Sequence, residues 1–382
     1  MPTAIAGIEA FFGDLEDPRI DRTKRHKLLD IIVIAISAVI CGADTWVDVA
    51  SFGKAKQDWL QTFLELPNGI PSHDTFNRVF NRLDTEQFSQ RFMPWIQSAS
   101  PLIGGQVIAI DGKVLRRSHD RGVGKAAIDM VSAWASANHL VLGQVKVDET
   151  SNEITAIPEL LRALTLTGCI VTIDAMGCQT EIAQQITEQG GAYVLALKQN
   201  QGRLYHDVSQ LFAYLEQQGY HAYPFDYHKT TDKGHGRTEI RECWTISDPE
   251  VLRLLHRSEA WPQLASVCRV RAQRIIGEER SVEDRFYLAA IDGAEEVLEG
   301  TRTHWQIENK LHWVLDVAFD EDHSRVRKGR GAENMAILRH IALNLLQQED
   351  SAKRSIHGKR LLAGWKNDYL LKVLATLFSP SQ

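Results

Sequence analysis

Three acidic residues stand where the sequence pattern would let them share chemistry. Asp111 ends a short apolar segment that begins at Gln106, and Asp174 follows another apolar segment, 169–173. If these segments are neighbouring parallel strands, both side chains emerge at one edge of a sheet. Carboxylates that meet in this way repel each other unless they share a cation or a proton. A divalent metal meets this need, because carboxylate oxygens are the ligands that Mg²⁺ and Mn²⁺ prefer.

A third acid is expected from a helix packed on the same sheet. Glu308 lies in the helical segment Thr301–Phe319, whose buried stripe is formed by Ile307, Leu311 and Leu315. Three acids of this kind can hold two ions, which suits in-line displacement at a phosphodiester. The acids therefore predict a centre for Mg²⁺ or Mn²⁺, with two ions, that acts on a nucleic-acid backbone.

Other interpretations of these residues stay open. Acids at strand ends are common and often serve structure alone, and Glu308 has nearby competitors in Asp316, Asp320, Glu321 and Asp322. A zinc helix is a further alternative, since a spacing of four would place on one face His304, Glu308, His312 and Asp316. The zinc motif H-E-x-x-H is absent, as are the phosphate-loop and dinucleotide fingerprints, which disfavours zinc, NTP-driven and NAD-dependent enzymes.

The segments around the acids predict a mixed α/β unit. Three strands with short connections are expected to pair antiparallel, and two later strands that alternate with helices are expected to run parallel. Together they form a ribonuclease H-like, mixed five-stranded sheet. The expected strands are Gln106–Asp111, Met130–Ala135, Leu140–Val147, Cys169–Ile173 and Ala192–Leu197, and the expected helices between them are Ile154–Leu164 and Thr180–Glu188.

Helical patterns dominate the residues before this sheet. Apolar positions recur at helical spacing over Leu28–Ile40, Val47–Leu66 and Phe76–Phe92, and Ser72 is placed to cap a helix. The turn before Ser72, with Arg78 and Arg82 on the following helix, is compatible with a helix-turn-helix. An ordinary helical hairpin is the alternative, because the motif has little sequence specificity.

The segment from about 207 to 292 predicts an inserted, largely antiparallel β subdomain, because its strand patterns carry charged residues at alternate positions. Its expected strands are Glu239–Ile246, Ala265–Ile275 and Arg285–Ile291. Helical patterns return after it, over 299–319, Ala332–Gln347 and Arg360–Leu377.

The composition is that of a globular protein. The 382 residues are 44% hydrophobic and 24% charged, which excludes a disordered chain, a collagen-like fibre and a coiled coil. Five scattered cysteines, without a C-x-x-C pair, predict neither a disulfide scaffold nor a cysteine zinc site and favour a reducing cytoplasm. No signal peptide or membrane span is predicted. The formal net charge of −6 does not itself indicate nucleic acid, although basic runs occur at 22–27, 113–125 and 325–330.

Several segments resemble the DDE transposases of bacterial insertion sequences, in the subgroup that includes the H-repeat-associated proteins of Rhs elements. The matching segments are Val107–Lys113, Thr172–Gln179, Leu197–Gln201 and the run His304–Val317, with its specific H-W-x-I-E-N-x-L-H-W pattern. Shorter matches at Glu321–Asp322, Asn334–Arg339 and Pro71–Phe76 extend the resemblance over almost the whole chain.

The resemblance implies a cytoplasmic enzyme that cleaves double-stranded DNA at element ends and transfers the freed 3′ ends to target DNA, with a homodimer on DNA as a further expectation. It implies that Asp111, Asp174 and Glu308 are the catalytic acids and metal ligands. It divides the chain into an N-terminal helical domain, 1–100, as a DNA-binding candidate, a catalytic domain, 104–350, with an insertion at about 207–292, and a helical extension, 351–382. The candidate DNA contacts are Lys113, Lys198, Asn200, Arg302, His304, Arg78 and Arg82.

The chain departs from the family pattern around Glu308. Related hairpin-forming transposases carry tyrosine and arginine before the glutamate and lysine after it, at positions that here hold Thr301, His304 and Leu315. Arg302 is a substitute for the arginine, but the resemblance does not extend to a hairpin intermediate. Two alternatives to transposition remain: a metal-dependent nuclease or resolvase with the same core, and a catalytically silent DNA-binding relic.

Overall fold

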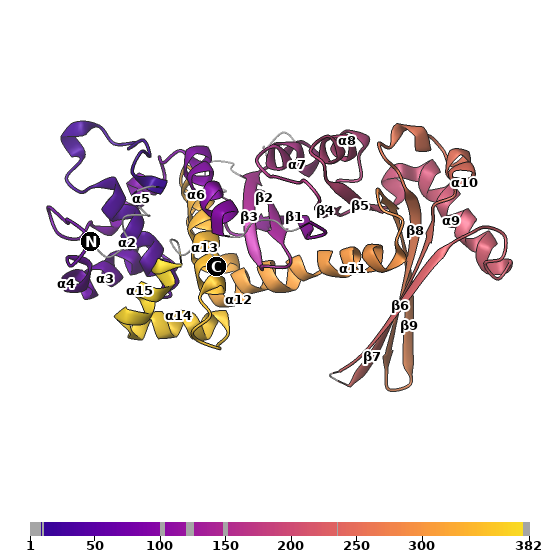
Figure 1. Ribbon diagram of the computed structural model, residues 1–382. Coiled ribbons are helices and arrows are strands. Elements are labelled where there is room, and N and C mark those ends of the chain that lie inside the picture. Colours follow the sequence, from indigo (N-terminus) through magenta and orange to yellow (C-terminus); the bar gives the residue numbers. More distant parts are fainter. Residues whose placement is uncertain are drawn as a thin grey trace.

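A computed structural model describes the chain at residue 9 and over 11–99, 104–119, 126–147, 152–234 and 236–376. The molecule is mixed α/β and elongated, with helices at one end, a sheet in the middle and long β-hairpins at the other end (Figure 1). Within the described ranges, no helix combines the length and the apolar character needed to span a membrane. The end of the second basic run, residues 120–125, lies outside the described residues.

The first part of the chain is helical, as predicted. α2 spans the predicted residues, and its apolar positions are buried on all sides, which places it in the core. The predicted helix Phe76–Phe92 is wrong in its continuity, because Asp84 accepts a hydrogen bond from the Gln87 N–H and starts a new helix. Val47–Leu66 is likewise interrupted after Ala55. The helices are α2 (Leu28–Ile40), α3 (Trp46–Ala55), α4 (Gln57–Leu60), α5 (His73–Phe80) and α6 (Thr85–Ala99), after a 3₁₀ turn at Asp21–Thr23.

The sheet confirms the predicted order of antiparallel and parallel pairs. β1 (Val107–Leu115) pairs antiparallel with β2 (Ile128–Ala135), which pairs with β3 (Leu140–Lys146). On its other side β1 runs parallel to β4 (Ile170–Ile173), which runs parallel to β5 (Ala192–Leu197). The crossover helices of these parallel pairs are α7 (Glu153–Arg162) and α8 (Thr180–Glu188).

The two faces of the sheet carry different layers. Alternate residues of β1 and β4 pack into the main core with α7 and α8, as Ile108 and Val171 do. The residues between them, such as Val107 and Ile170, pack with Val297 on α11 (Ala294–His304), which crosses the opposite face (Figure 1). This alternation decides which side chains of β1 and β4 face α11.

The inserted segment is antiparallel, as predicted, but it extends the same sheet. β9 (Glu279–Ala289) pairs with β5, so that one nine-stranded sheet runs in the order β3-β2-β1-β4-β5-β9-β8-β7-β6. β6 (Asp226–Gly234), β7 (Arg237–Ile246), β8 (Ser266–Ile276) and β9 form two hairpins that project from the body (Figure 1). Sequence analysis missed β6 and the helix α9 (Gly202–Gln217) before it. The other elements here are a 3₁₀ turn at Gln199–Gln201, α10 (Pro249–Leu254) and a 3₁₀ turn at Ser258–Ala260.

The C-terminal helices join the N-terminal helices to the sheet. α13 (Gly331–Gln348) packs against α2 and β3, and its Asn334 donates hydrogen bonds to the carbonyls of Phe80 and Leu83. The predicted helix Arg360–Leu377 is instead two helices, because the backbone becomes extended at Lys366. These are α14 (Ile356–Trp365) and α15 (Asn367–Ala375), and a 3₁₀ turn at Glu321–His323 precedes α13.

Candidate active site

Asp111 and Asp174 come together at the end of the parallel pair β1–β4. Ile110 lies opposite Ile173 in the register, so Asp111 is the next residue on β1 and Asp174 directly follows the end of β4. Asp111 lies four residues beyond Val107, which packs with α11, and alternation therefore directs its side chain toward the α11 face. The charge of Asp174 acts on Asp111 and on His304 of α11, which places Asp174 near the same site. The predicted placement at one sheet edge is confirmed.

The turn after Asp174 is fixed by hydrogen bonds. The Asp174 carboxylate accepts from the backbone N–H groups of Met176 and Gly177, at 3.0 and 3.3 Å. The Asn200 amide donates to the Ala175 carbonyl at 2.5 Å, and Gln201 adds a second amide bond to the same turn. Asn200 was expected to contact DNA, but its amide nitrogen is engaged in holding the Asp174 turn.

Asp111 is mostly buried among other acids. Burial first, and then the charges of Asp174, Glu153 and Glu308, raise the pKa of Asp111 to about 7. His312 Nδ1 lies 3.6 Å from Asp111 Oδ2, but burial lowers the pKa of this histidine to about 4. The imidazole is therefore neutral at pH 7 and does not offset the negative charge.

Glu308 lies in a π-helical segment, Ile307–His312, which separates α11 from α12 (Trp313–Phe319). Ile307 and Leu311 are buried as predicted, while the Glu308 side chain is exposed. The prediction of one continuous α-helix over Thr301–Phe319 is wrong, because the wider π turn shifts the faces on either side of it. Short π segments inside α-helices are frequent at functional sites.

Three of the four residues of the zinc alternative go to different partners, and the fourth, Glu308, is exposed. His304 Nδ1 lies 3.2 Å from the Thr172 hydroxyl, and burial lowers its pKa to about 4. His312 faces Asp111, and Asp316 pairs with Lys113. The π turn thus breaks the face that a spacing of four predicts. His304 was also expected to contact DNA, but its Nδ1 is directed at β4.

Lys113 is not a free surface cation. Its ammonium lies 2.5 Å from Asp316 Oδ1 and 2.9 Å from Glu321 Oε2, and its side chain is only 12% exposed. Arg339 approaches the other Glu321 oxygen at 3.6 Å. The expected phosphate contact is corrected to a buried ion-pair network that ties β1 to α12 and to the turn after it.

The remaining predicted DNA contacts differ in their surroundings. Arg302 forms an ion pair with Asp232 at 2.9 Å, which links α11 to β6. Lys198 is exposed at the end of β5, and Arg78 and Arg82 are exposed on and just after α5. Within the described residues, these three cations have no acidic partner, so they are available to an anionic ligand.

Sequence analysis missed Glu153, the first residue of α7. It lies on the opposite side of the sheet from Glu308 and raises the pKa of Asp111 more than Glu308 does. Burial and the charges of Asp174 and Asp129 raise its own pKa to about 7. In the sequence, Glu153 is marked only as an acid directly after Asn152, which caps the helix. An acid at this position normally indicates no more than a favourable charge at a helix start.

The acids fit a hard divalent cation in their chemistry. None of Asp111, Asp174, Glu153 and Glu308 pairs with a lysine or arginine in the described part of the chain, and all offer carboxylate oxygens. Across the described ranges, no three His, Cys, Asp or Glu side chains lie close enough together to share one ion. Joint ligation therefore requires side-chain rearrangement around Asp111.

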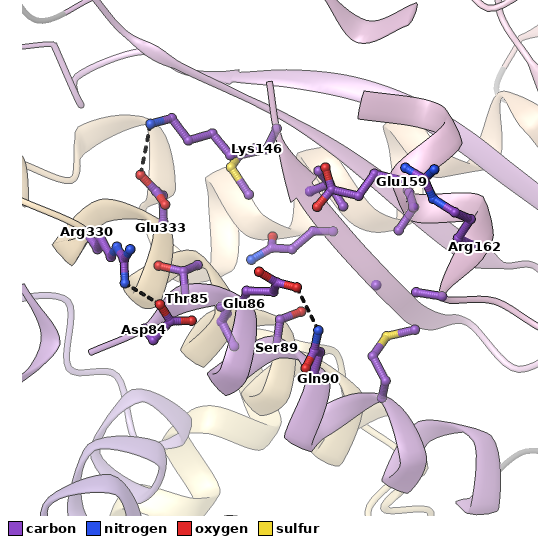
Figure 2. Close-up of a pocket in the computed structure, with 18 residues that line it drawn as sticks. Asp84, Thr85, Glu86, Ser89, Gln90, Lys146, Glu159, Arg162, Arg330 and Glu333 are labelled. Atoms are coloured by element: carbon purple, nitrogen blue, oxygen red, sulfur yellow. Dashed lines mark hydrogen bonds and ion pairs between the residues drawn. The ribbon is translucent and has the colours of Figure 1, made fainter. Parts of the chain in front are cut away.

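A polar cavity of about 620 Å³ lies away from these acids, between α6, β3, α7 and α13 (Figure 2). Two ion pairs lie in its walls: Arg330 binds Asp84 at 2.6 Å, and Lys146 lies 3.3 Å from Glu333. The first pair connects the residue before α6 to the residue before α13, and the second connects β3 to α13. The cavity is a junction between the helical and sheet parts of the molecule.

Two family models match the chain. Residues 103–345 match the model described as a transposase DDE domain, and residues 9–96 match one described as DDE_Tnp_1-associated. The chain is 40% identical to "H repeat-associated putative transposase YhhI" of Escherichia coli K12, over 92% of this chain and 93% of that protein. It is 38% identical to "Putative transposase YncI" of Escherichia coli O157:H7, over 98% and 95%.

Among solved structures, the piggyBac transposase synaptic complex with hairpin DNA aligns over the whole chain and 83% of that chain, at 11% identity and a TM-score of 0.43. This likeness is too weak to assign the fold.

Proposed function

The chain belongs to the transposase DDE domain family and is a transposase, and from that premise we propose that Asp111, Asp174 and Glu308 are its catalytic acids. The observation that carries this assignment is the convergence of charge on Asp111. This residue is mostly buried and has no cation beside it in the described structure. The negative charges of Asp174, Glu153 and Glu308 act on it. A buried carboxylate in such surroundings is a functional-site candidate.

We propose that β1–β5 and their helices form a ribonuclease H-like core. The strand order β3-β2-β1-β4-β5, with antiparallel pairs followed by parallel pairs, supports this. The β-rich segment between Asp174 and Glu308 is then an insertion at the far edge of that core. Residues 104–350 would be the catalytic domain, with residues 1–100 as a DNA-binding domain and 351–382 as a helical extension.

Enzymes of this family use divalent metal ions, and we propose Mg²⁺ or Mn²⁺, with two ions, because every acid offers oxygen ligands. When bound, such ions activate a nucleophile and stabilise the leaving oxygen of a phosphodiester. Asp111 and Asp174 would hold the metal from β1 and β4, and Glu308 would reach it from the π-helical segment.

The chain's other residues keep these acids in place. Asn200 and Gln201 hold the turn that carries Asp174, and Lys113 joins β1 to α12 behind Glu308. With this geometry fixed, cleavage at an element end and attack of the freed 3′-OH on target DNA can use the same acids for both displacements. The proposed DNA partner would contact Lys198 near the acids, and Arg78 and Arg82 on the N-terminal helices, with a homodimer on DNA.

A strand-transfer assay tests this function against a simple nuclease. The purified chain is incubated with Mg²⁺, a labelled duplex that carries an end of its own element and an unlabelled target plasmid. We expect cleavage at the element end and covalent joining of the labelled 3′ end to the plasmid. Cleavage without joining would favour the nuclease alternative, and binding without cleavage would favour the silent relic.

A further inference from the structure

Glu153 and Gly112 form a close contact that nothing in the fold alone explains. A Cβ atom built at Gly112 would lie 2.0 Å from Glu153 Oε1 and 2.5 Å from its Cδ. The backbone of Gly112 lies outside the left-handed region, so glycine is not needed here for conformation. The absence of a side chain leaves space for the Glu153 carboxylate, and any other residue at 112 would displace that carboxylate from β1.

The strand ends leave room for Glu153 at this point. β4 stops at Ile173, and β1 continues to Leu115 with no partner on that side in the described structure. Asp111 and Gly112 are the first residues beyond the last β1–β4 pair. A side chain from α7 on one face and one from the π-helical segment on the other can therefore both approach Asp111.

The surroundings of Glu153 are electrostatically unfavourable without a cation. Within the described residues the carboxylate has neither a hydrogen-bond donor nor a basic partner, and it is half-buried beside Asp111, Asp174 and Asp129. An acid in a first helical turn gains only a modest interaction with the helix dipole. It would keep that interaction if it pointed to solvent, so the dipole does not account for its place over Gly112.

We propose that Glu153 is a fourth carboxylate ligand of the metal centre, and that Gly112 is glycine in order to admit it. This inference rests on the proposed function, in which Asp111, Asp174 and Glu308 hold divalent ions. It adds a ligand from α7, on the face of the sheet opposite Glu308.

Binding of Mn²⁺ alone to the full-length chain, without DNA, tests the inference. Free Mn²⁺ is followed by electron paramagnetic resonance for wild type, Glu153→Gln and Gly112→Ala. We expect Glu153→Gln to weaken Mn²⁺ binding by about tenfold or more, since even outer-shell partners of a metal are worth that much. We expect Gly112→Ala to weaken it similarly, because the added methyl displaces the carboxylate. The double variant should be no weaker than Glu153→Gln, since both act on one contact.

Glu181→Gln is the matched control, because Glu181 is also an acid in the first turn of its helix, α8, and is exposed. It should bind Mn²⁺ like wild type. Thermal unfolding without metal provides a folding check. Glu153→Gln should match or exceed the wild-type midpoint there, because repulsion is relieved, and should gain less from added Mn²⁺.

Wild-type Mn²⁺ affinity in Glu153→Gln would overturn the inference. Asp111→Asn shows where the failure lies. If Asp111→Asn loses Mn²⁺ binding and Glu153→Gln does not, the proposed centre stands and Glu153 is no ligand. If neither variant changes Mn²⁺ binding, the proposed metal centre itself fails. A loss in Glu153→Gln without one in Gly112→Ala would retain the ligand and refute the role of Gly112.

Discussion

Lys113 on β1 and Asp316 on α12 form an ion pair of 2.5 Å that is largely shielded from water. The pair joins the strand that carries Asp111 to the helix that follows Glu308. The π-helical segment that carries Glu308 lies just before α12 and departs from regular α-helical geometry. The position of Glu308 is therefore defined by this ion pair and by the buried Ile307 and Leu311.

Replacing Lys113 with methionine should destabilise the protein by about 3 kcal/mol, because the buried Glu321 and the half-buried Asp316 would lose their main cation. Urea unfolding measures this change. Lys229→Met, which removes a half-exposed ion pair on β6, is the control and should change the free energy of unfolding by less than about 1 kcal/mol. Equal effects in the two variants would refute the anchor.

Asp111→Asn and Glu308→Gln should separate cleavage from binding. Both substitutions nearly preserve shape and remove a proposed metal-ligating charge, so cleavage of element-end DNA should fall by orders of magnitude. Binding should persist, because phosphate contacts from lysine and arginine supply most of the affinity. Gel-shift and cleavage assays on the same duplex measure both. A joint loss of binding and cleavage would indicate that these acids are structural.

Cleavage should require Mg²⁺ or Mn²⁺. Ca²⁺ should support DNA binding better than cleavage, because its longer and more variable coordination positions the reacting oxygens poorly. The measurement is product formation after chelation and after each metal is restored. Full activity in the chelated protein would exclude the proposed centre.

Arg78→Ala and Arg82→Ala should weaken binding to element ends while metal-dependent nicking of non-specific DNA stays largely intact. Both side chains are exposed and lack an acidic partner in the described structure, so their loss should not disturb the fold. Binding titrations at two salt concentrations test this, since loss of a phosphate contact also reduces the salt dependence. Unchanged binding in both variants would assign these helices to packing.

Stability should fall as the solution becomes acidic, in part through His340. Burial lowers the pKa of this residue to about 4, while the unfolded chain takes up the proton near 6.5. The folded state is therefore favoured most above pH 6.5 and loses this advantage as the pH falls toward 4. Between pH 7 and pH 5 the loss amounts to about 2 kcal/mol.

Urea unfolding at the two pH values checks the contribution of His340. His340→Met, which cannot titrate, should lose about 2 kcal/mol less than wild type over this interval. His357→Met, at an exposed position, should behave like wild type. An unchanged pH dependence in His340→Met would show that His340 is not the source.

Sequence patterns predicted the sheet well and the helical segment that carries Glu308 less well. The apolar runs that became β1, β4 and β5 are buried on both faces, and such runs mark parallel strands clearly. The π-helical segment has no such signal, because Thr301–Phe319 contains neither glycine nor proline and keeps a helical apolar stripe. The partners of Lys113 and His304, which are Asp316 and Thr172, could not be predicted either, because they come from distant segments of the chain.

The strands of the insertion were predicted only in part for a similar reason. β6 has no buried residue, and its alternate half-buried positions, His228, Thr230 and Asp232, are polar, so no apolar alternation marks it in the sequence. Glu153 shows the opposite difficulty. An acid at a helix start is ordinarily explained by its favourable interaction with the helix dipole. Only the contact of Glu153 with Gly112 in the folded structure indicates a further role.

The pairing of β9 with β5 also has a mechanical consequence. The two projecting hairpins and the strand next to Asp174 belong to one hydrogen-bonded ladder, whereas an insertion on a flexible linker would be free to swing. A load applied at the hairpin tips is thus carried through β9 into β5 and on to β4. If a molecule bound to the hairpins pulled on them, the force would be transmitted through the sheet as a torque on the strands that lead to the carboxylates. The hairpins would then act as a lever.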